Sequence, residues 1–260
     1  MTELHGPIGI FDSGIGGLTV ASSIQRSLPN HTIIYFGDTV HLPYGDKSVS
    51  SIQGYIKRIT AFLADQHCSH LVVACNSASS VLADEFVVGN FARVINVIDP
   101  VVNHLCQIDG IKKVGVIGTK RTIRSHIYRD HIHALRPELE VAELETPLLA
   151  PMIEEGFIKN EIASTVIHEY LEKLKDVDAL ILGCTHYPLI KGQIAEFYGD
   201  KVLLLDAPEL IALELKQITR PAEIKKRPDH FYVSDYTTSF EETAKLFFGQ
   251  SITLEEKRLK

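Results

Sequence analysis

The sequence predicts an α/β fold of two similar lobes, each with a mostly parallel sheet flanked by helices, and with the active site in the cleft between the lobes. Three observations lead to this prediction. Short apolar runs rich in β-branched residues alternate with longer segments of helical period. Each short run is apolar throughout, as is typical of strands buried on both faces of a sheet. Finally, one plan (apolar strand, cysteine, polar residues, helix) occurs twice.

Eight short apolar runs are expected to be strands: 8–11, 32–36, 71–74, 94–97, 114–117, 179–182, 202–205 and 231–233. The segments between them carry apolar residues at helical spacing. One stripe consists of Ile52, Ile56, Ile59 and Leu63. A second consists of Ile162, Val166, Tyr170 and Leu174, and is widened by Ile167 and Leu171.

The composition narrows the classes of function. The chain has 260 residues, 45% of them hydrophobic and 23% charged, with a formal net charge of −7. That charge does not attract a phosphate backbone, so no nucleic-acid partner is expected. No apolar run approaches the roughly 18 residues of a membrane-spanning helix, and the N-terminus lacks the pattern of a secretory signal. Four cysteines without a C-x-x-C pair indicate reduced thiols, so we expect a soluble, cytoplasmic protein with no membrane partner.

The repeated plan centres on Cys75 and Cys184. Leu71-Val72-Val73-Ala74-Cys75-Asn76-Ser77 and Leu180-Ile181-Leu182-Gly183-Cys184-Thr185-His186 each end an apolar run with a cysteine and polar residues. Two lobes that each present a cysteine at the carboxyl end of a strand would place both thiols at a shared cleft, where open α/β sheets bind ligands.

A glycine-rich segment, Asp12-Ser13-Gly14-Ile15-Gly16-Gly17, follows the first predicted strand and leads into a helix. Glycines let backbone N–H groups approach a ligand. A G-x-G-x-x-G dinucleotide motif fails here because its sixth position is Thr19. A tight strand-to-helix turn also accounts for the glycines, but not for Asp12, an acid placed to face the cleft.

Cys75 in an apolar strand is compatible with a buried small hydrophobe. Its position where the strand ends and a helix starts favours a reactive thiol, because a helix N-terminus lowers the pKa of a cysteine. Asn76 and Ser77 supply donors for a carboxylate.

Cys184 admits three interpretations: a Cys–His nucleophile, a metal site, or a thiol that transfers protons. A nucleophile needs one thiol rather than two in matched settings, and the neighbouring residues provide few further metal ligands. The matched pair therefore favours two proton carriers and no metal. Cys68 and Cys106 lack this context and are interpreted as structural.

The polar segment from Gly37 to Gly45 is a loop punctuated by Pro43 and glycines. Loops at this edge of a sheet often carry binding groups. A plain connection explains it equally well.

Taken together, these residues resemble the glutamate racemases of the aspartate/glutamate racemase superfamily. The resemblance rests on five segments, in the family's order: Phe11-Asp12-Ser13-Gly14-Ile15-Gly16-Gly17-Leu18, Tyr35-Phe36-Gly37-Asp38-Thr39, Pro43-Tyr44-Gly45, Cys75-Asn76-Ser77-Ala78-Ser79 and Gly183-Cys184-Thr185-His186-Tyr187-Pro188. Gly115-Val116-Ile117-Gly118-Thr119 and Pro151-Met152-Ile153-Glu154-Glu155-Gly156 match less closely.

The resemblance implies that residues 1–97 and 207–260 form one lobe and residues 98–206 the other. It implies catalytic roles for Cys75 and Cys184, and auxiliary acid/base roles for Asp12, Glu154 and His186. The implied substrate contacts are Asp12, Ser13, Tyr44, Gly45, Asn76, Ser77, Thr185 and His186, with Thr119 a weaker candidate.

The implied activity is the interconversion of L- and D-glutamate by two thiols, without a cofactor or metal, to supply D-glutamate for peptidoglycan. No lysine stands in a setting typical of pyridoxal phosphate. The alternatives are an aspartate racemase and an inactive dicarboxylate-binding protein. The expected partner is a small molecule, glutamate; the resemblance also allows a homodimer, but no helix exterior predicts its interface.

The chain departs from the family pattern at three places. Ser77 stands where threonine is usual, Val40-His41-Leu42 replaces a small residue followed by arginine, and Gly118 replaces alanine. None removes a reactive group, so they concern substrate tuning and not the reaction.

Overall fold

The computed structural model describes residues 6–199, 201–218 and 227–259, and its strands form two sheets. The larger sheet consists of β1 (Ile8–Asp12), β2 (Ile33–Gly37), β3 (His70–Val73), β4 (Arg93–Asn96), β9 (His230–Val233) and β10 (Leu254–Glu256). The smaller sheet consists of β5 (Lys113–Gly118), β6 (Glu140–Glu145), β7 (Ala179–Gly183) and β8 (Leu203–Leu205). Their orders are β10-β9-β2-β1-β3-β4 and β6-β5-β7-β8, and every strand pairing is parallel. The predicted fold class of two α/β lobes is confirmed.

Helices cover the larger sheet on both faces. The covering elements are α1 (Leu18–Ser27), α2 (Val49–Asp65), the short α3 (Asn76–Ser79), α10 (Ala207–Ile218) and α11 (Thr238–Phe248). The predicted stripe on α2 is correct, since Ile52, Ile56, Ile59 and Leu63 are all buried. Helix α2 begins after Ser48, whose hydroxyl accepts a hydrogen bond from the Ser51 N–H and caps the helix.

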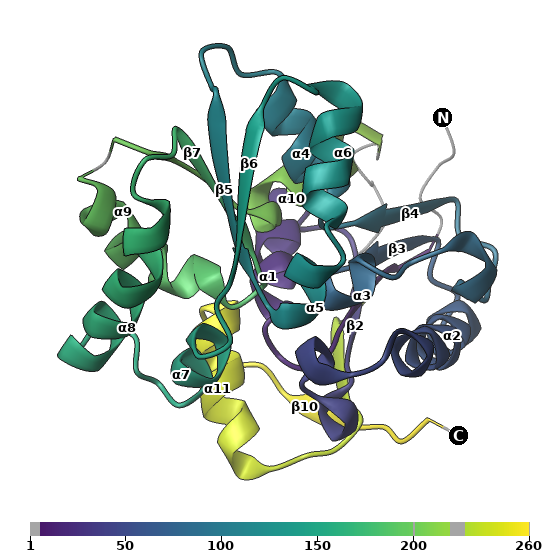
Figure 1. Cartoon of the computed structure of the whole chain (residues 1–260). Helices are drawn as coiled ribbons and strands as arrows, with labels where there is room; N and C mark the ends of the chain where they lie inside the picture. Colours follow the sequence, from purple (N-terminus) through teal and green to yellow (C-terminus); the bar gives the residue numbers. More distant parts are fainter. Residues whose placement is uncertain (1–5, 200, 219–226, 260) are drawn as a thin grey trace.

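The smaller sheet is flanked by the helices of the second lobe (Figure 1). They are α4 (Asp99–Cys106), α5 (Lys120–Arg124), α6 (Ile127–Leu135), α7 (Leu149–Glu154), α8 (Glu161–Leu171) and α9 (Lys191–Tyr198). The stripe predicted on α8 is partly wrong. The helix buries Ala163, Ile167 and Leu171, whereas Ile162 is exposed. The rest of the prediction holds, since Ile167, Leu171 and Leu174 are buried and Val166 and Tyr170 are half-buried.

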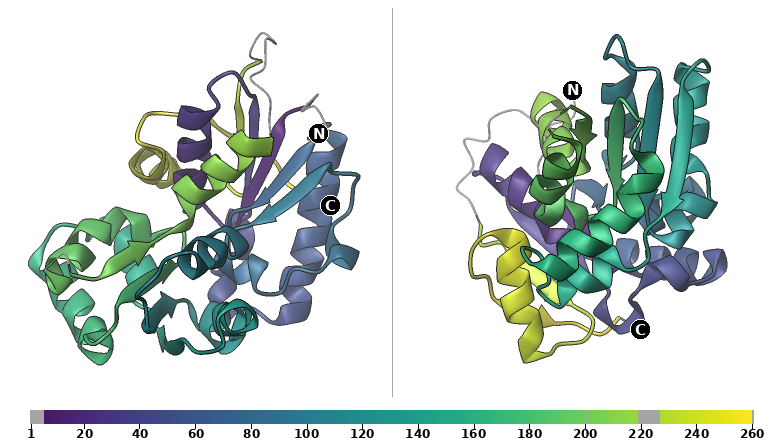
Figure 2. Two further views of the ribbon diagram at one scale, coloured as in Figure 1. Left: turned by 90° about the horizontal axis from the view of Figure 1, so that it is seen from above. Right: turned by 60° about the vertical axis from the view of Figure 1, so that its left-hand side comes forward.

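The two lobes lie side by side, as the view from above in Figure 2 shows. Helix α10 packs against α1, and α4 packs against both α10 and α6. The chain leaves the larger sheet after β4 and builds the smaller one from β5 to β8. It then returns so that β9 pairs with β2 and β10 pairs with β9.

Two strands, β6 and β10, were not predicted from the sequence. Strand β6 has the sequence Glu-Val-Ala-Glu-Leu-Glu and lies at the edge of its sheet, and none of its residues is fully buried. Strand β10 is a three-residue edge strand with two exposed glutamates. The edge strands β4 and β8 carry short apolar runs and were predicted, whereas glutamates interrupt β6 and make up most of β10, so a search for continuous apolar runs misses these two.

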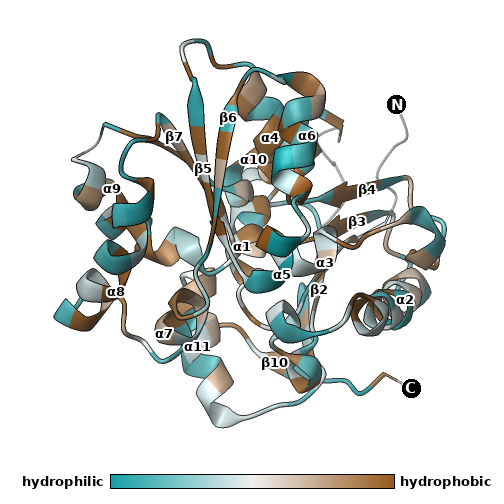
Figure 3. Ribbon diagram, viewed as in Figure 1, coloured by the Kyte–Doolittle hydropathy of each residue, from teal (hydrophilic) through white to brown (hydrophobic). Residues whose placement is uncertain are grey.

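The elements after the two cysteines differ from the expected helices. After Cys75 the helix α3 has only four residues. After Cys184 the chain forms a 3-10 helix, η5 (Tyr187–Ile190), before α9 begins at Lys191. Apolar side chains concentrate on the strands at the centre of the molecule, while the outer faces of the helices are mixed (Figure 3). No helix within the described residues is both long and apolar enough to cross a bilayer.

Candidate active site

A cavity of about 230 Å³, partly open to solvent, is lined by both candidate cysteines. It is lined by residues of both lobes: Ser13, Gly14, Leu42, Pro43, Tyr44, Gly45, Cys75, Asn76, Ser77, Thr119, Ala150, Pro151, Glu154, Cys184, Thr185 and His186. Strands β1, β3 and β7 each end beside this cavity. The parallel sheets thus bring polar side chains that are far apart in sequence to one place, at the carboxyl ends of their strands.

Cys75 follows β3 and occupies the N-cap position of α3. Its sulfur accepts a hydrogen bond from the Ala78 N–H at 3.4 Å, and its thiol lies 3.5 Å from Ser13 Oγ. The residue is only 5% exposed, so the sulfur reaches the cavity but not bulk solvent. This geometry gives Cys75 one open side, which faces whatever the cavity binds.

The pKa of Cys75 runs opposite to the sequence prediction. Burial raises it, the nearby Asp12 carboxylate raises it further, and hydrogen bonds from Ser13 and Ala78 lower it only in part; the result is a pKa of about 12. The N-terminus of α3 does lower this pKa through the Ala78 N–H, as expected, but the cost of burying a thiolate is larger, so the expected low pKa is wrong. Cys75 is therefore a protonated thiol at neutral pH.

Asp12 lies beneath the cavity and does not line it. The carboxyl group is fully buried: Oδ2 accepts from the Gly14 N–H at 3.0 Å, while Oδ1 has no hydrogen-bond partner among the described residues. Burial raises the pKa of Asp12, and the charge of His186 and three backbone N–H groups oppose that rise. Asp12 therefore influences Cys75 and His186 through its charge.

Cys184 is the first member of a three-residue chain of contacts in the second lobe. Its sulfur lies 3.5 Å from His186 Nδ1, and His186 Nε2 lies 2.8 Å from Glu154 Oε1. Cys184 and His186 come from the loop after β7, and Glu154 from the end of α7. Cys184 is 7% exposed, so it is nearly as enclosed as Cys75.

The surroundings of His186 favour its charged form. Burial disfavours the imidazolium, but the adjacent Cys184 sulfur and the Glu154 carboxylate outweigh burial and raise the pKa of His186 to about 10. The two thiols thus have opposite electrostatic neighbours, a carboxylate at Cys75 and an imidazolium at Cys184.

Hydrogen bonds across the cavity join the two lobes. Ser77 Oγ lies 2.9 Å from Thr119 Oγ1, and Thr19 Oγ1 donates to the Thr185 carbonyl oxygen at 3.1 Å. At the rim, Arg121 donates to the Lys47 carbonyl oxygen at 2.7 Å. These contacts hold the lobes close together and keep the cavity small.

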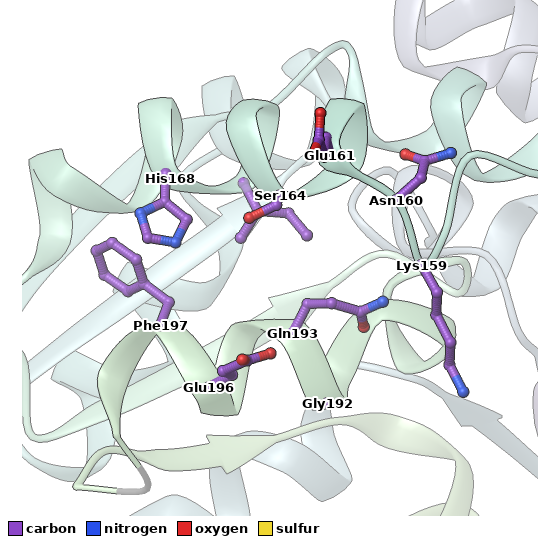
Figure 4. Close-up of a pocket in the computed structure, with 10 residues that line it drawn as sticks. Lys159, Asn160, Glu161, Ser164, His168, Gly192, Gln193, Glu196 and Phe197 are labelled. Carbon is purple, nitrogen blue, oxygen red and sulfur yellow. The ribbon is translucent and has the colours of Figure 1, made fainter.

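Larger hollows exist elsewhere on the molecule. One of about 760 Å³ lies between α8 and α9 on the outer side of the second lobe (Figure 4). Its side chains include Glu161, Ser164, His168, Gln193 and Glu196, and no cysteine is among them in the described residues. His168 is occupied by an edge-to-face contact with Phe197. Nor do the described residues include a group of three or more His, Cys, Asp or Glu able to hold a metal ion.

The structure brings together nearly all of the residues named from the sequence. Ser13, Tyr44, Gly45, Cys75, Asn76, Ser77, Thr119, Glu154, Cys184, Thr185 and His186 all line the cavity, and Asp12 lies behind it. The sequence interpretation missed Leu42, Pro43, Ala150 and Pro151, which are apolar and complete the wall. Leu42 and Pro43 lie in the loop that was recognised, and Ala150 and Pro151 lie on α7, but an apolar side chain carries no chemical signal of its own.

Comparison with known proteins agrees with this geometry. The model of the Asp/Glu/Hydantoin racemase family matches residues 18–215. The chain belongs to this family. The glutamate racemase of Geobacter metallireducens is 40% identical over 249 residues, which cover 93% of this chain and 92% of that protein. The resemblance drawn from the sequence motifs is therefore confirmed, and the chain is an isomerase of the racemase class.

Solved structures of relatives show the same architecture. The glutamate racemase of Francisella tularensis, crystallised with D-glutamate, is 36% identical, with a TM-score of 0.90 and coverage of 98% of both chains. The glutamate racemase isoform RacE1 of Bacillus anthracis is 34% identical, with a TM-score of 0.92 and coverage of 99% of both chains. The structural likeness to these two racemases therefore covers almost the whole of this chain.

Proposed function

We propose that this racemase interconverts L- and D-glutamate by proton transfer between the substrate and two thiols, Cys75 and Cys184, without a cofactor. The observation that carries the proposal is that both cysteines, one from each lobe, line a single pocket. Racemisation removes the α-proton on one face of the substrate and returns a proton on the other. Two acid/base groups from opposite lobes meet that requirement without any movement of the substrate.

We propose that Cys75 starts as the thiol and Cys184 as the base. Burial and the nearby Asp12 carboxylate raise the pKa of Cys75, and His186 Nδ1 lies 3.5 Å from the Cys184 sulfur, where it can exchange a proton with it. Cys184 then removes the α-proton of L-glutamate, and Cys75 delivers its own proton to the opposite face, which yields D-glutamate. D-glutamate reacts through the other form of the enzyme, in which Cys75 is the thiolate and Cys184 the thiol.

The intermediate carries negative charge at the α-carbon and needs strong stabilisation. Hydroxyl and amide groups of Ser13, Asn76 and Thr185 line the cavity and can donate hydrogen bonds to the substrate carboxylate. In a cavity this small, such donors act with little competition from water. Asp12, Glu154 and His186 serve as auxiliary groups that set the charge of the two sulfurs.

The choice of glutamate over aspartate rests on the relatives, several of which bear the name glutamate racemase and one of which was crystallised with D-glutamate. We further propose that the D-glutamate is used for peptidoglycan and that the enzyme works in the cytoplasm.

The test is exchange of the α-proton in deuterated water, followed by mass spectrometry and by circular dichroism of each glutamate enantiomer. We expect the unmodified protein to racemise glutamate faster than aspartate and to incorporate solvent deuterium, with or without a chelator. Cys75→Ala and Cys184→Ala should each abolish two-way racemisation, whereas Cys106→Ala, a cysteine remote from the cavity, should not. A chelator-sensitive activity contradicts the proposal, and binding of glutamate without exchange identifies an inactive binding protein.

A further inference from the structure

Tyr128 connects the two lobes through Asn76, a residue that lines the cavity, although neither its sequence context nor the family motifs single it out. It lies on α6 of the second lobe and is 1% exposed. Its hydroxyl group donates a hydrogen bond of 2.7 Å to Asn76 Oδ1, in the first lobe and next to Cys75. We propose that Tyr128 is a positioning residue that fixes the side-chain amide of Asn76 with its NH₂ group toward the substrate carboxylate.

The two ends of the Asn76 amide have opposite effects on an anion. The oxygen accepts hydrogen bonds and repels a carboxylate, while the NH₂ group donates two. In the described part of the chain, Oδ1 is bonded to Tyr128 and Nδ2 has no protein partner. Nδ2 is not one of the fully buried polar atoms that lack a partner, so it is accessible from the cavity that Asn76 lines. The amide is therefore held with its donor end free for a ligand.

Tyr128 is suited to hold this orientation because it remains a donor. Burial raises the pKa of its phenol far above the ordinary value, and the negative charges of Cys184 and Asp99 add to the effect. A hydroxyl that keeps its proton in the working range can make the observed donation to Oδ1 at any working pH. If that proton is lost by mutation, the amide can turn over and present its oxygen to the substrate.

The ring of Tyr128 also contacts the second cysteine loop. A Cβ atom added to Gly183, the residue before Cys184, would lie 3.3 Å from Tyr128 Cε2. One side chain thus touches the residue before one cysteine and bonds the residue after the other. The orientation of Asn76 consequently depends on the two lobes being closed on each other.

This inference rests on the proposed function, and its test separates the two. Tyr128→Phe keeps the ring and removes the hydroxyl. The matched control is Tyr198→Phe, which also removes a buried hydroxyl with one hydrogen bond, to the Leu174 carbonyl oxygen at 3.0 Å, but in the outer part of the second lobe. We expect Tyr128→Phe to raise KM for both glutamate enantiomers roughly tenfold or more, the effect of losing one hydrogen bond to a charged group. KM of Tyr198→Phe should stay at that of the unmodified enzyme.

A second measurement tests whether Tyr128 acts through Asn76. If it does, adding Tyr128→Phe to Asn76→Ala should raise KM no further than Asn76→Ala alone. If the two substitutions each raise KM and their effects multiply in the double variant, the inference is overturned. It is also overturned if Tyr128→Phe retains the unmodified KM and only melts at a lower temperature than Tyr198→Phe, because Tyr128 is then only structural. Calorimetric binding of D-glutamate to Cys75→Ala, with and without Tyr128→Phe, gives the same comparison without turnover. If the unmodified protein binds glutamate but does not racemise it, the proposed function fails while this comparison still decides the role of Tyr128.

Discussion

Gly16 of the first lobe lies directly against the imidazole of His186 of the second. A Cβ atom at this position would lie 2.5 Å from His186 Nδ1 and 2.6 Å from Thr185 Oγ1. Contacts this short do not occur between non-bonded atoms, so either the imidazole or the lobe must move. Closure of the lobes around the cavity therefore depends on the absence of a side chain at Gly16.

Gly16→Ala is accordingly expected to reduce kcat/KM for glutamate by at least about tenfold, because it displaces His186 from Cys184. The control is Gly54→Ala in the middle of α2, where no described atom lies within 4 Å of the added methyl group. That variant should retain activity and gain up to about 1 kcal/mol in unfolding free energy, the helix propensity difference between glycine and alanine. Urea unfolding and a racemisation assay measure both effects. Full activity in Gly16→Ala contradicts the stated role of the contact.

The two thiols should differ in reactivity toward iodoacetamide. Thiolates react and thiols do not. Because Cys75 is held protonated, with a pKa of about 12, and Cys184 lies beside an imidazolium, Cys184 should be alkylated first at pH 7.5. Peptide mass spectrometry over time gives the rates. D-glutamate should slow the modification of Cys184, and the buried Cys68, whose pKa is also raised to about 12, should stay unmodified. Faster modification of Cys75 would reverse the assignment of the resting state.

Replacing His186 by asparagine should lower kcat by roughly 10²-fold, as loss of a group that assists proton transfer usually does. KM should change little, because the cavity keeps its other donors. The pH profile provides a sharper check. The pKa of His186 is raised to about 10, so its imidazolium is present below that value and is lost as the pH rises through it. In the unmodified enzyme kcat should fall in this alkaline range, and the His186→Asn profile should lack that fall.

Stability should decrease on mild acidification because of His31 and His70. Both are buried, and within the described residues neither ring nitrogen of His31 has a hydrogen-bond partner. Burial lowers the pKa of both, and their mutual proximity lowers that of His70 further. The unfolded chain then binds more protons than the folded protein just below pH 6.5. The contribution of these two histidines to the free energy of unfolding is therefore fully present above that pH and is lost as the pH falls below it.

The check is the urea midpoint of unfolding measured between pH 7.5 and pH 5. His31→Leu, which removes the titrating group from an apolar site, should reduce the slope, whereas His104→Leu on the exposed face of α4 should not. An unchanged slope in His31→Leu would assign the acid sensitivity to other groups.

The sequence predicted the central strands and both cysteines for one physical reason. Strands buried on both faces must be apolar throughout, and a cysteine followed by polar residues at their carboxyl ends marks the edge where ligands bind. Strand β6 could not be found in this way, because it lies at the edge of its sheet and glutamates interrupt its apolar residues. The glycines of the first loop were recognised, but the reason for Gly16 was not, because the neighbour that excludes a side chain there is His186, 170 positions later in the chain.

Two further features could not be predicted from local sequence. The pKa of Cys75 depends on how completely the fold buries the thiol and on how close Asp12 lies to it. Neither can be inferred from a pattern of helical residues. Tyr128 stands on an ordinary amphipathic helix, and its role appears only when the lobes place its hydroxyl on Asn76. Functional residues that act across a domain interface leave no motif within their own segment.

The pairing of β2 with β9 has a consequence for synthesis. About three quarters of the chain separates the two strands, and β2 is flanked by β1 on one side only until β9 is made. During translation the smaller sheet, whose four strands follow one another in the chain, can assemble before the larger one is complete. An incomplete sheet with an unpaired apolar strand tends to associate with other chains, so nascent chains truncated before residue 230 should depend on chaperones to stay dispersed.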